Sequence, residues 1–485
     1  MIGCGGSAST PPASLIIDPA AVPVLDAWAA AIGGRDKIAA LDGIHETGTV
    51  SREGYPEGTY EIWRMARGER FYRESLAGFD TVRVFDGTHV WERDGAGNVR
   101  DGNGDELAFE RTFTFWTSFA ALVPGRSAGE VRAATNNTLV IAPRDGHEVT
   151  VSFDATTHRP VAYSQLDGET AVIDTLDDWR VVDGVWFPFR TSRTWNGGNL
   201  AVWKATALDH APPPPFARPI PRPTPRLLAP VMVPLEIAGG VGYVSLRVGD
   251  SEPLRFLLDT ALPYSVVRSD IAGGKPSYPH ATLHIGQLDV IDIPLDTHRF
   301  DEAAVRQFAP LDGILGYDVL AKYAVEIDAT TKTLRFGDRD SYRHGPGGNA
   351  IAMVLEHAIP VFPITLELPN RKPIEARVGL DTTCPCAVKI GTAFTESNHL
   401  LDRLDGAPVR DSRGLIGLSA RADGVRIGTA RLLRPFVLFS TEHDFRDPEI
   451  VGTVGFGALP GYIVVLDYAH DRIWFDPSVS AAASD

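Results

Sequence analysis

Several features that mark common protein classes are scarce or absent in this chain. It has three cysteines in 485 residues, Cys4, Cys384 and Cys386, too few for a disulfide framework and without the paired spacing of a zinc site. No run reaches the ~18 apolar residues that a membrane-spanning helix needs. Basic runs are also absent and the net charge is −16. Nucleic acid and anionic membrane are therefore excluded as main partners, because both attract clusters of lysine and arginine.

Sequence signatures of several enzyme classes are missing as well. The chain has no Gly-x-Ser-x-Gly, no His-Glu-x-x-His and no phosphate-binding loop. We expect neither a metal nor another cofactor in its function. Cys384 and Cys386 are predicted to be small buried hydrophobic residues, because two cysteines alone seldom form a metal site.

The beginning of the chain resembles the end of a bacterial lipoprotein signal. Gly3-Cys4 follows an apolar residue, and small residues and prolines follow it, as in a flexible tether; the charged and apolar parts of a signal are missing. We predict that residues 1–18 form a tether and that Cys4 carries a lipid. The abundance of Ala, Gly and Pro suggests a bacterial genome. The expected location is the bacterial cell envelope, as a periplasmic or outer-membrane-anchored lipoprotein, or outside the cell.

Residues 19–210 have the pattern of one β-rich domain. Apolar residues first recur at helical spacing from Val22 to Leu41, with a break at Gly33-Gly34. Period-two alternation follows, with turn pairs such as Asp183-Gly184 and Asn196-Gly197 at short intervals. We predict an antiparallel half-barrel wrapped around a helix.

Residues 211–230 are a domain boundary. Four prolines follow one another from Pro212, and four more come at every second position from Pro219 to Pro225. Neither helix nor strand tolerates this density of proline, so we predict an extended linker.

The most informative feature of the sequence is a pattern that occurs twice after the linker. Phe256-Leu257-Leu258 leads into Asp259-Thr260, and Val378-Gly379-Leu380 leads into Asp381-Thr382, 122 positions later (381 − 259). A second block follows the Asp-Thr pair in each copy, and the two copies of this block are separated by a constant offset of 139 (455 − 316). Its members are Gly313, Ile314, Leu315 and Gly316 in the first copy and Gly452, Val454 and Gly455 in the second. This register predicts two pseudo-symmetric β-units, residues 231–345 and 346–478.

Residues 231–476 resemble the bacterial retropepsin-like and pepsin-like aspartic proteases on these motifs. The resemblance implies a mainly β fold of two β-barrel units and an aspartic-type endopeptidase whose substrate is a peptide or protein. Asp259 and Asp381 would be the catalytic pair, sharing one proton and activating a water molecule. Thr260 and Thr382 would bond across the axis between the units. By analogy, residues 271–282 and 391–413 would cover the substrate groove.

The chain departs from the family pattern at one position in each turn. The family has glycine after Asp-Thr, where this chain has Ala261 and Thr383. Glycine lets the backbone approach the carboxylates closely, and a β-branched threonine disfavours positive φ. Whether the pair works depends on how the second turn accommodates Thr383.

The first 210 residues resemble, more faintly, periplasmic lipoprotein carriers of the half-barrel type. This resemblance implies a lipid or acyl ligand in the first domain. The alternative to peptide hydrolysis is therefore a non-catalytic envelope protein that binds lipid, lipoprotein or extended peptide. In either case the chain would meet a membrane only through a lipid anchor.

Overall fold

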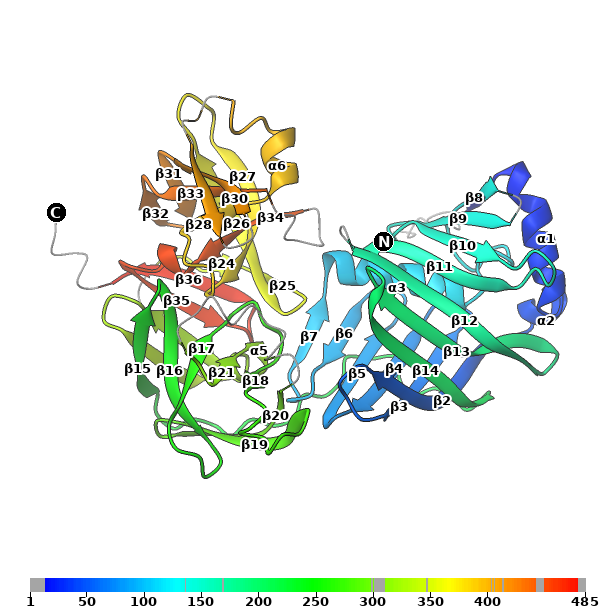
Figure 1. Cartoon of the computed structure of the whole chain (residues 1–485), viewed down its shortest axis with the longest axis horizontal. Coiled ribbons are helices and arrows are strands. Elements are labelled where there is room, and N and C mark those ends of the chain that lie inside the picture. The colour runs from blue at the N-terminus through cyan, green and yellow to red at the C-terminus, as the bar shows by residue number, and fades with distance from the viewer. Residues whose placement is uncertain are drawn as a thin grey trace, which may run out of the picture.

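A computed structural model describes residues 14–135, 137–167, 170–297, 300, 310–345, 348–402, 404, 406–411, 414–441 and 449–478. Cys4 lies outside the described residues, so its lipidation stays a prediction. The fold is mainly β, as expected, with a first domain followed by two β-units (Figure 1). Among the described helices, none combines the length and the apolar character that crossing a membrane requires.

The first domain is built on one 14-stranded sheet in the order β1-β8-β9-β10-β11-β12-β13-β14-β2-β3-β4-β5-β6-β7. The strands are β1 (Leu15–Ile17), β2 (Gly43–Arg52), β3 (Gly58–Met65), β4 (Arg70–Leu76), β5 (Phe79–Phe85), β6 (Val90–Arg93), β7 (Val99–Gly102), β8 (Gly129–Thr135), β9 (Thr138–Pro143), β10 (Val149–Phe153), β11 (Pro160–Asp167), β12 (Thr170–Val182), β13 (Val185–Trp195) and β14 (Gly198–Asp209). All neighbours are antiparallel except β1 and β8, which are parallel. The predicted half-barrel is thus confirmed, and it curves around α3 (Gly104–Thr117) in Figure 1.

The helical start of the domain is also confirmed. A 3-10 turn, η1 (Pro19–Ala21), precedes α1 (Val22–Ala31) and α2 (Arg35–Ala39), which lie at the end of the domain far from the β-units (Figure 1). The break between α1 and α2 falls on Gly33 and Gly34, both at positive φ. The predicted tether extends too far, because Leu15–Ile17 pair with Gly129–Val131 and form an edge strand.

The proline-rich linker has neither helix nor strand between residues 211 and 230, but it contacts the first domain. Arg218 forms an ion pair with Asp101, and the Arg222 amide donates to the carbonyl of Gly97 at 2.9 Å. The linker is therefore held along the turn between β6 and β7 before it enters the first β-unit.

The same turn joins the first domain to the first β-unit. Lys322 Nζ donates to the carbonyl of Ala96 at 2.8 Å, and Asn98 Nδ2 donates to the carbonyl of Asp318 at 2.8 Å. Ala96 is 2% exposed and packs within the large core that both β-units share.

The first β-unit contains β15 (Val231–Ala238), β16 (Val241–Val248), β17 (Leu254–Leu258), β18 (Val266–Val267), β19 (Ser277–Ile285), β20 (Leu288–Asp296), β21 (Gly313–Leu315), α5 (Tyr317–Leu320), β22 (Tyr323–Asp328) and β23 (Thr333–Asp338). The second contains β24 (Ile351–Ala352), β25 (Val354–Glu356), β26 (Ile359–Glu367), β27 (Ile374–Asp381), β28 (Val388–Ile390), α6 (Thr392–Ser397), β29 (Ala407–Asp411), β30 (Gly414–Arg421), β31 (Gly424–Ile427), β32 (Ala430–Leu433), β33 (Phe436–Ser440), β34 (Ile450–Gly455), η3 (Phe456–Ala458), β35 (Tyr462–Asp467) and β36 (Arg472–Pro477). A short helical turn follows the second motif block in each unit, as predicted.

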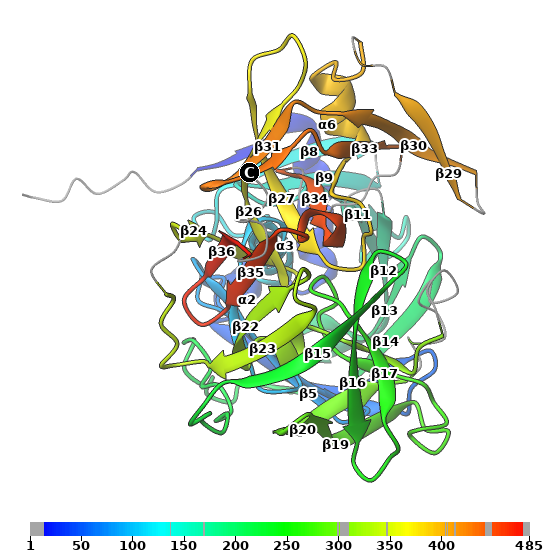
Figure 2. The same ribbon diagram turned by 90° about the vertical axis from the view of Figure 1, so that its left-hand side faces the viewer.

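The two units share a six-stranded layer in the order β15-β23-β22-β35-β36-β24, which faces the viewer in Figure 2. Its central pair, β22 and β35, is antiparallel, with Ala324 opposite Asp467 and Asp328 opposite Ile463. The sequence offset of 139 maps Ala324 onto Ile463 and Asp328 onto Asp467, so it converts each of these two pairs into the other. The strand register therefore has the same twofold symmetry as the two units. The axis that relates the units thus runs between β22 and β35.

Candidate active site

Each Asp-Thr turn sits at the end of a strand that is covered by the second motif block. In the first unit β21 lies between β17 and β18, parallel to β17, with Leu258 opposite Leu315. In the second unit β34 lies between β27 and β28 in the same way, with Leu380 opposite Val454. The two motif blocks of each copy, separated in sequence, are therefore adjacent strands in space.

The glycines of the second block allow this block to lie directly against the turn. A side chain at Gly316 would place its Cβ 2.8 Å from the carbonyl oxygen of Leu262, and one at Gly455 would place it 2.4 Å from that of Cys386. Both distances are shorter than van der Waals contact, so a larger residue would push the turn away from the strand. Matching backbone bonds result: the Tyr317 amide donates to Leu262 and the Phe456 amide to Cys384, each at 2.8 Å.

Thr260 and Thr382 hold the two turns together across the axis. Both residues are fully buried. The Thr260 hydroxyl donates to the carbonyl of Leu380 at 2.8 Å, and the Thr382 hydroxyl donates to the carbonyl of Leu258 at 2.6 Å. Each hydroxyl also accepts the other threonine's amide, at 3.1 and 3.2 Å.

This arrangement brings the carboxyl groups of Asp259 and Asp381 into one electrostatic environment. Burial and the negative charge of Asp381 raise the pKa of Asp259 to about 7, although the amides of Ala261 and Leu262, which donate to Asp259 Oδ1 at 2.8 and 3.1 Å, work in the opposite direction. A carboxyl group whose pKa is raised this far by burial and a neighbouring carboxylate can retain its proton near neutral pH.

Thr383 is accommodated without the backbone strain that its β-branched side chain suggests. Neither Ala261 nor Thr383 is among the described residues with positive φ. The Thr383 amide and hydroxyl both donate to Asp381 Oδ1, at 2.8 and 2.6 Å. The residue in the glycine position therefore orients the carboxylate as well as fitting beside it.

The second turn is one residue longer than the first. Val266 is the seventh residue after Asp259 and lies opposite Ile314, whereas Lys389, the eighth after Asp381, lies opposite the matching residue Thr453. Cys384 and Cys386 lie in this longer turn and are joined by a disulfide. The prediction that they are buried hydrophobic residues is wrong, because both are half-exposed and bonded to each other.

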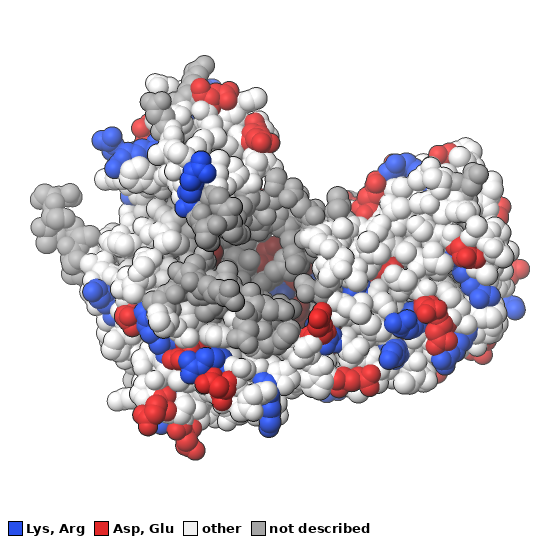
Figure 3. All heavy atoms as spheres, in the orientation of Figure 1, with Lys and Arg blue, Asp and Glu red and all other residues white. Residues whose placement is uncertain are grey.

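A cavity of about 1320 Å³ opens beside the second turn. Asp381 and Thr383 lie in its wall. The first unit contributes Gly239, Val241, Tyr243 and Ala261, and the rest of the wall comes from the second unit, including residues of β30, β32 and β33. Figure 3 shows that the face of the molecule seen in Figure 1 is hollowed where the two β-units and the first domain meet. Of the two segments expected to cover the groove, 391–413 contributes Val409, and the described part of 271–282 contributes no residue.

Sequence reasoning missed Tyr468, a buried residue near Asp259. Burial, with the neighbouring Tyr317 and Asp259, raises its pKa well above the usual value. Its ring meets that of Tyr317 edge-on at 5.3 Å, and its hydroxyl has no hydrogen-bond partner among the described residues. The matched position in the first unit is Ala329, so comparing the two copies gave no signal for it.

Comparison with known proteins gives distant similarities. No protein family profile and no curated protein matches the chain. Among solved structures, the chain is similar to basic 7S globulin from soybean, at 11% identity and a TM-score of 0.36, over 53% of this chain and 97% of that one. It is also similar to an aspartic proteinase from Irpex lacteus, at 14% identity and a TM-score of 0.38, over 53% of this chain and 99% of that one. With scores this low, neither similarity bears on the activity of this chain.

Proposed function

We propose that this chain is an aspartic-type endopeptidase in which Asp259 and Asp381 activate a water molecule for attack on a peptide bond. The observation that carries this proposal is the raised pKa of Asp259, which burial and the negative charge of Asp381 bring to about 7, so that this carboxyl group is partly protonated near neutral pH. An acid and a base are then present together at neutral or mildly acidic pH, as hydrolysis of an amide by water requires.

The proposed reaction needs no group beyond the pair and the water. The ionised carboxyl of the pair takes a proton from the water as it attacks the carbonyl carbon, and the protonated carboxyl donates to the carbonyl oxygen. When the tetrahedral intermediate collapses, the leaving nitrogen receives a proton from the pair. The threonines hold the two carboxyl groups in register through these steps, because their hydroxyls fix each turn to the strand of the other unit.

The cavity beside the second turn supports a peptide as the substrate class. Its wall combines apolar side chains such as Leu432, Phe436 and Leu438 with the backbone of the Asp381 turn. Walls of this composition suit an extended chain whose side chains are apolar around the cleaved bond.

The test is cleavage of a broad peptide library by purified full-length protein across pH 3 to 8, with products identified by mass spectrometry. Asp259→Asn should abolish cleavage while the protein stays folded, because an amide cannot act as the base or share the proton. Asp270→Asn is the matched control, since Asp270 is exposed and pairs only with Arg268 on the surface. Cleavage by Asp259→Asn at the wild-type rate would falsify the proposal, and so would a wild-type protein that cuts no peptide in the library.

The alternative, a non-catalytic binder of lipid, lipoprotein or extended peptide, has one observation in its favour. The first domain encloses a cavity of about 320 Å³ lined by aromatic residues such as Trp28, Trp116 and Trp203. Its wall also contains the buried ion pair of Arg70 and Glu110, so the lining is not wholly apolar. Mass spectrometry of lipid extracts from the purified protein distinguishes the two functions. The envelope location and the lipid on Cys4 stay predictions.

A further inference from the structure

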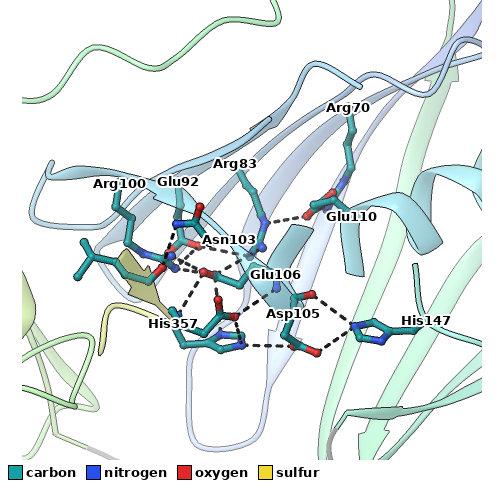
Figure 4. Close-up of polar contacts among 12 residues, drawn as sticks. Arg70, Arg83, Glu92, Arg100, Asn103, Asp105, Glu106, Glu110, His147 and His357 are labelled. Carbon is teal, nitrogen blue, oxygen red and sulfur yellow. Dashed lines mark hydrogen bonds and ion pairs between the residues drawn. The ribbon is translucent and has the colours of Figure 1, made fainter. Parts of the chain in front are cut away.

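A cluster of charged side chains lies where the first domain meets the second β-unit. Asp105 is near the beginning of α3, and Glu356 and His357 lie at the turn between β25 and β26, about 250 positions later in the chain (Figure 4). Asp105 and Glu356 are 8% and 4% exposed, and His357 is half-buried. The cluster is thus a largely buried interdomain contact in which His357 remains partly exposed.

The spacing of these three side chains is that of ligands around one metal ion. One ligand atom from each lies within 4.8 Å of the others. His357 Nε2 is 3.5 Å from an Asp105 carboxylate oxygen and 3.6 Å from Glu356 Oε1. Two ligands of a tetrahedral zinc ion with bonds of about 2.1 Å are separated by about 3.4 Å, which is close to both of these distances.

The cluster around these three residues contains more carboxylates than guanidinium groups. Its five carboxylates are Glu92, Asp105, Glu106, Glu110 and Glu356, and its three guanidinium groups are Arg70, Arg83 and Arg100. With neutral histidines this leaves two negative charges in excess in a buried place, and the positive end of the α3 dipole offsets only about half of one. A divalent cation would restore neutrality.

His147 holds Asp105 in the orientation that such a site requires. Its Nε2 lies 2.9 Å from Asp105 Oδ1, while the other carboxylate oxygen, Oδ2, faces His357. Asp105 is therefore oriented toward the junction, with a partner behind it of the kind that orients metal ligands.

We propose that Asp105, Glu356 and His357 bind a divalent transition-metal ion, with Zn²⁺ as the fitting species, that fastens the first domain to the second β-unit. One imidazole and two carboxylates suit zinc, and water completes a tetrahedron. The bound ion joins α3 to the hairpin of β25 and β26, and β26 pairs along its length with β27, the strand that ends at Asp381. The site is independent of the proposed peptidase chemistry.

The test is metal analysis of the full-length protein after equilibration with Zn²⁺ and dialysis against metal-free buffer at pH 7.5. We expect about one zinc per chain and a higher melting temperature with Zn²⁺ than with Mg²⁺, since only the former favours three such ligands in a tetrahedron. His357→Asn should weaken zinc binding more than about 100-fold, and His147→Ala should weaken it about 10- to 100-fold, as is typical when a residue that orients a ligand is lost.

The variants are chosen so that folding does not obscure the result. His357 has a φ of 50°, a conformation that asparagine tolerates well. His280→Ala is the matched control, because His280 is exposed and pairs with Asp292 far from the cluster. The proposal is overturned if the wild-type protein retains no zinc and its melting temperature does not change with Zn²⁺. Protonated histidines would then balance the excess negative charge of the cluster. It is equally overturned if His357→Asn binds zinc as the wild-type protein does.

Discussion

The hydroxyl of Thr260 and the hydroxyl of Thr382 each donate a hydrogen bond to the backbone of the opposite unit, two residues before the other threonine. The four bonds of this exchange are buried and related by the axis between β22 and β35. The turns that carry Asp259 and Asp381 are consequently fixed to one another and not only to their own units.

Removing one of these hydroxyls should destabilise the protein and impair the site together. Thr260→Val keeps the shape but leaves the Leu380 carbonyl and the Thr382 amide without a partner, at about 1–3 kcal/mol per buried group. Urea unfolding should show the loss, and Thr260→Ser, which keeps the hydroxyl, should show much less. Equal stability of the valine and serine variants would contradict this prediction.

Activity and stability should both fall as the pH rises through about 7. The pKa of Asp259 is raised by burial and by Asp381 from 3.8 to about 7. Because the folded value lies above the unfolded one, this group's contribution to stability is complete below about pH 4 and is lost as the pH passes 7. The pair also loses its shared proton there, so kcat/KM should decline. Thermal unfolding between pH 4 and 8 should show a weaker pH dependence for Asp259→Asn than for the wild-type protein.

Thr383 should contribute to activity through its hydroxyl rather than its size. Thr383→Val removes the 2.6 Å bond to Asp381 Oδ1 and keeps the volume. We expect kcat/KM to fall about tenfold or more, since hydrogen bonds to charged groups contribute about 1.5–3 kcal/mol. Thr383→Ser should stay within a few-fold of wild type. If the valine variant is as active as the serine variant, the hydroxyl has no orienting role.

Asp318 should be a source of alkaline instability. It is 1% exposed, and burial raises its pKa to about 7 against the effect of the Ser265 hydroxyl, which donates to Asp318 Oδ1 at 2.6 Å. Asp318→Asn retains an acceptor for Ser265 and cannot ionise. Its melting temperature should match wild type at pH 5 and exceed it at pH 9. A lower value than wild type at pH 9 would show that the charged form is stabilised instead.

The disulfide beside Asp381 can be checked by peptide mapping. Alkylation of denatured but unreduced protein should leave Cys384 and Cys386 unmodified, and prior reduction should expose both. Since only Pro385 separates the two, the bridge restrains the unfolded chain little, by about 1–2 kcal/mol in the chain-entropy account. Labelling of both cysteines without reductant would show that the bridge does not form.

The sequence predicted the two β-units well because their signals are local and repeated. Strands ending in Asp-Thr and the Gly-x-x-Gly blocks each specify a backbone arrangement, and a constant offset relates the copies. The contacts between Thr260 and Thr382 were expected from the resemblance to aspartic proteases. The half-barrel was equally accessible, because alternation along each strand and turn pairs such as Asn196-Gly197 reflect local backbone geometry.

Features that depend on one copy alone were beyond sequence reasoning. The extra residue in the second turn, the Cys384–Cys386 bridge and Tyr468 have no counterpart in the first unit. Asp105 and His357 meet only because two domains dock, and no periodicity or spacing encodes a contact across 250 positions.

The position of Ala96 in the core of the β-units has a consequence for how the chain is made. The turn between β6 and β7 leaves the ribosome more than 200 residues before Lys322 and the rest of its docking site exist. Ala96 can therefore become buried only after the first β-unit has formed. Docking of this turn against the β-units is accordingly a late step in the assembly of the protein.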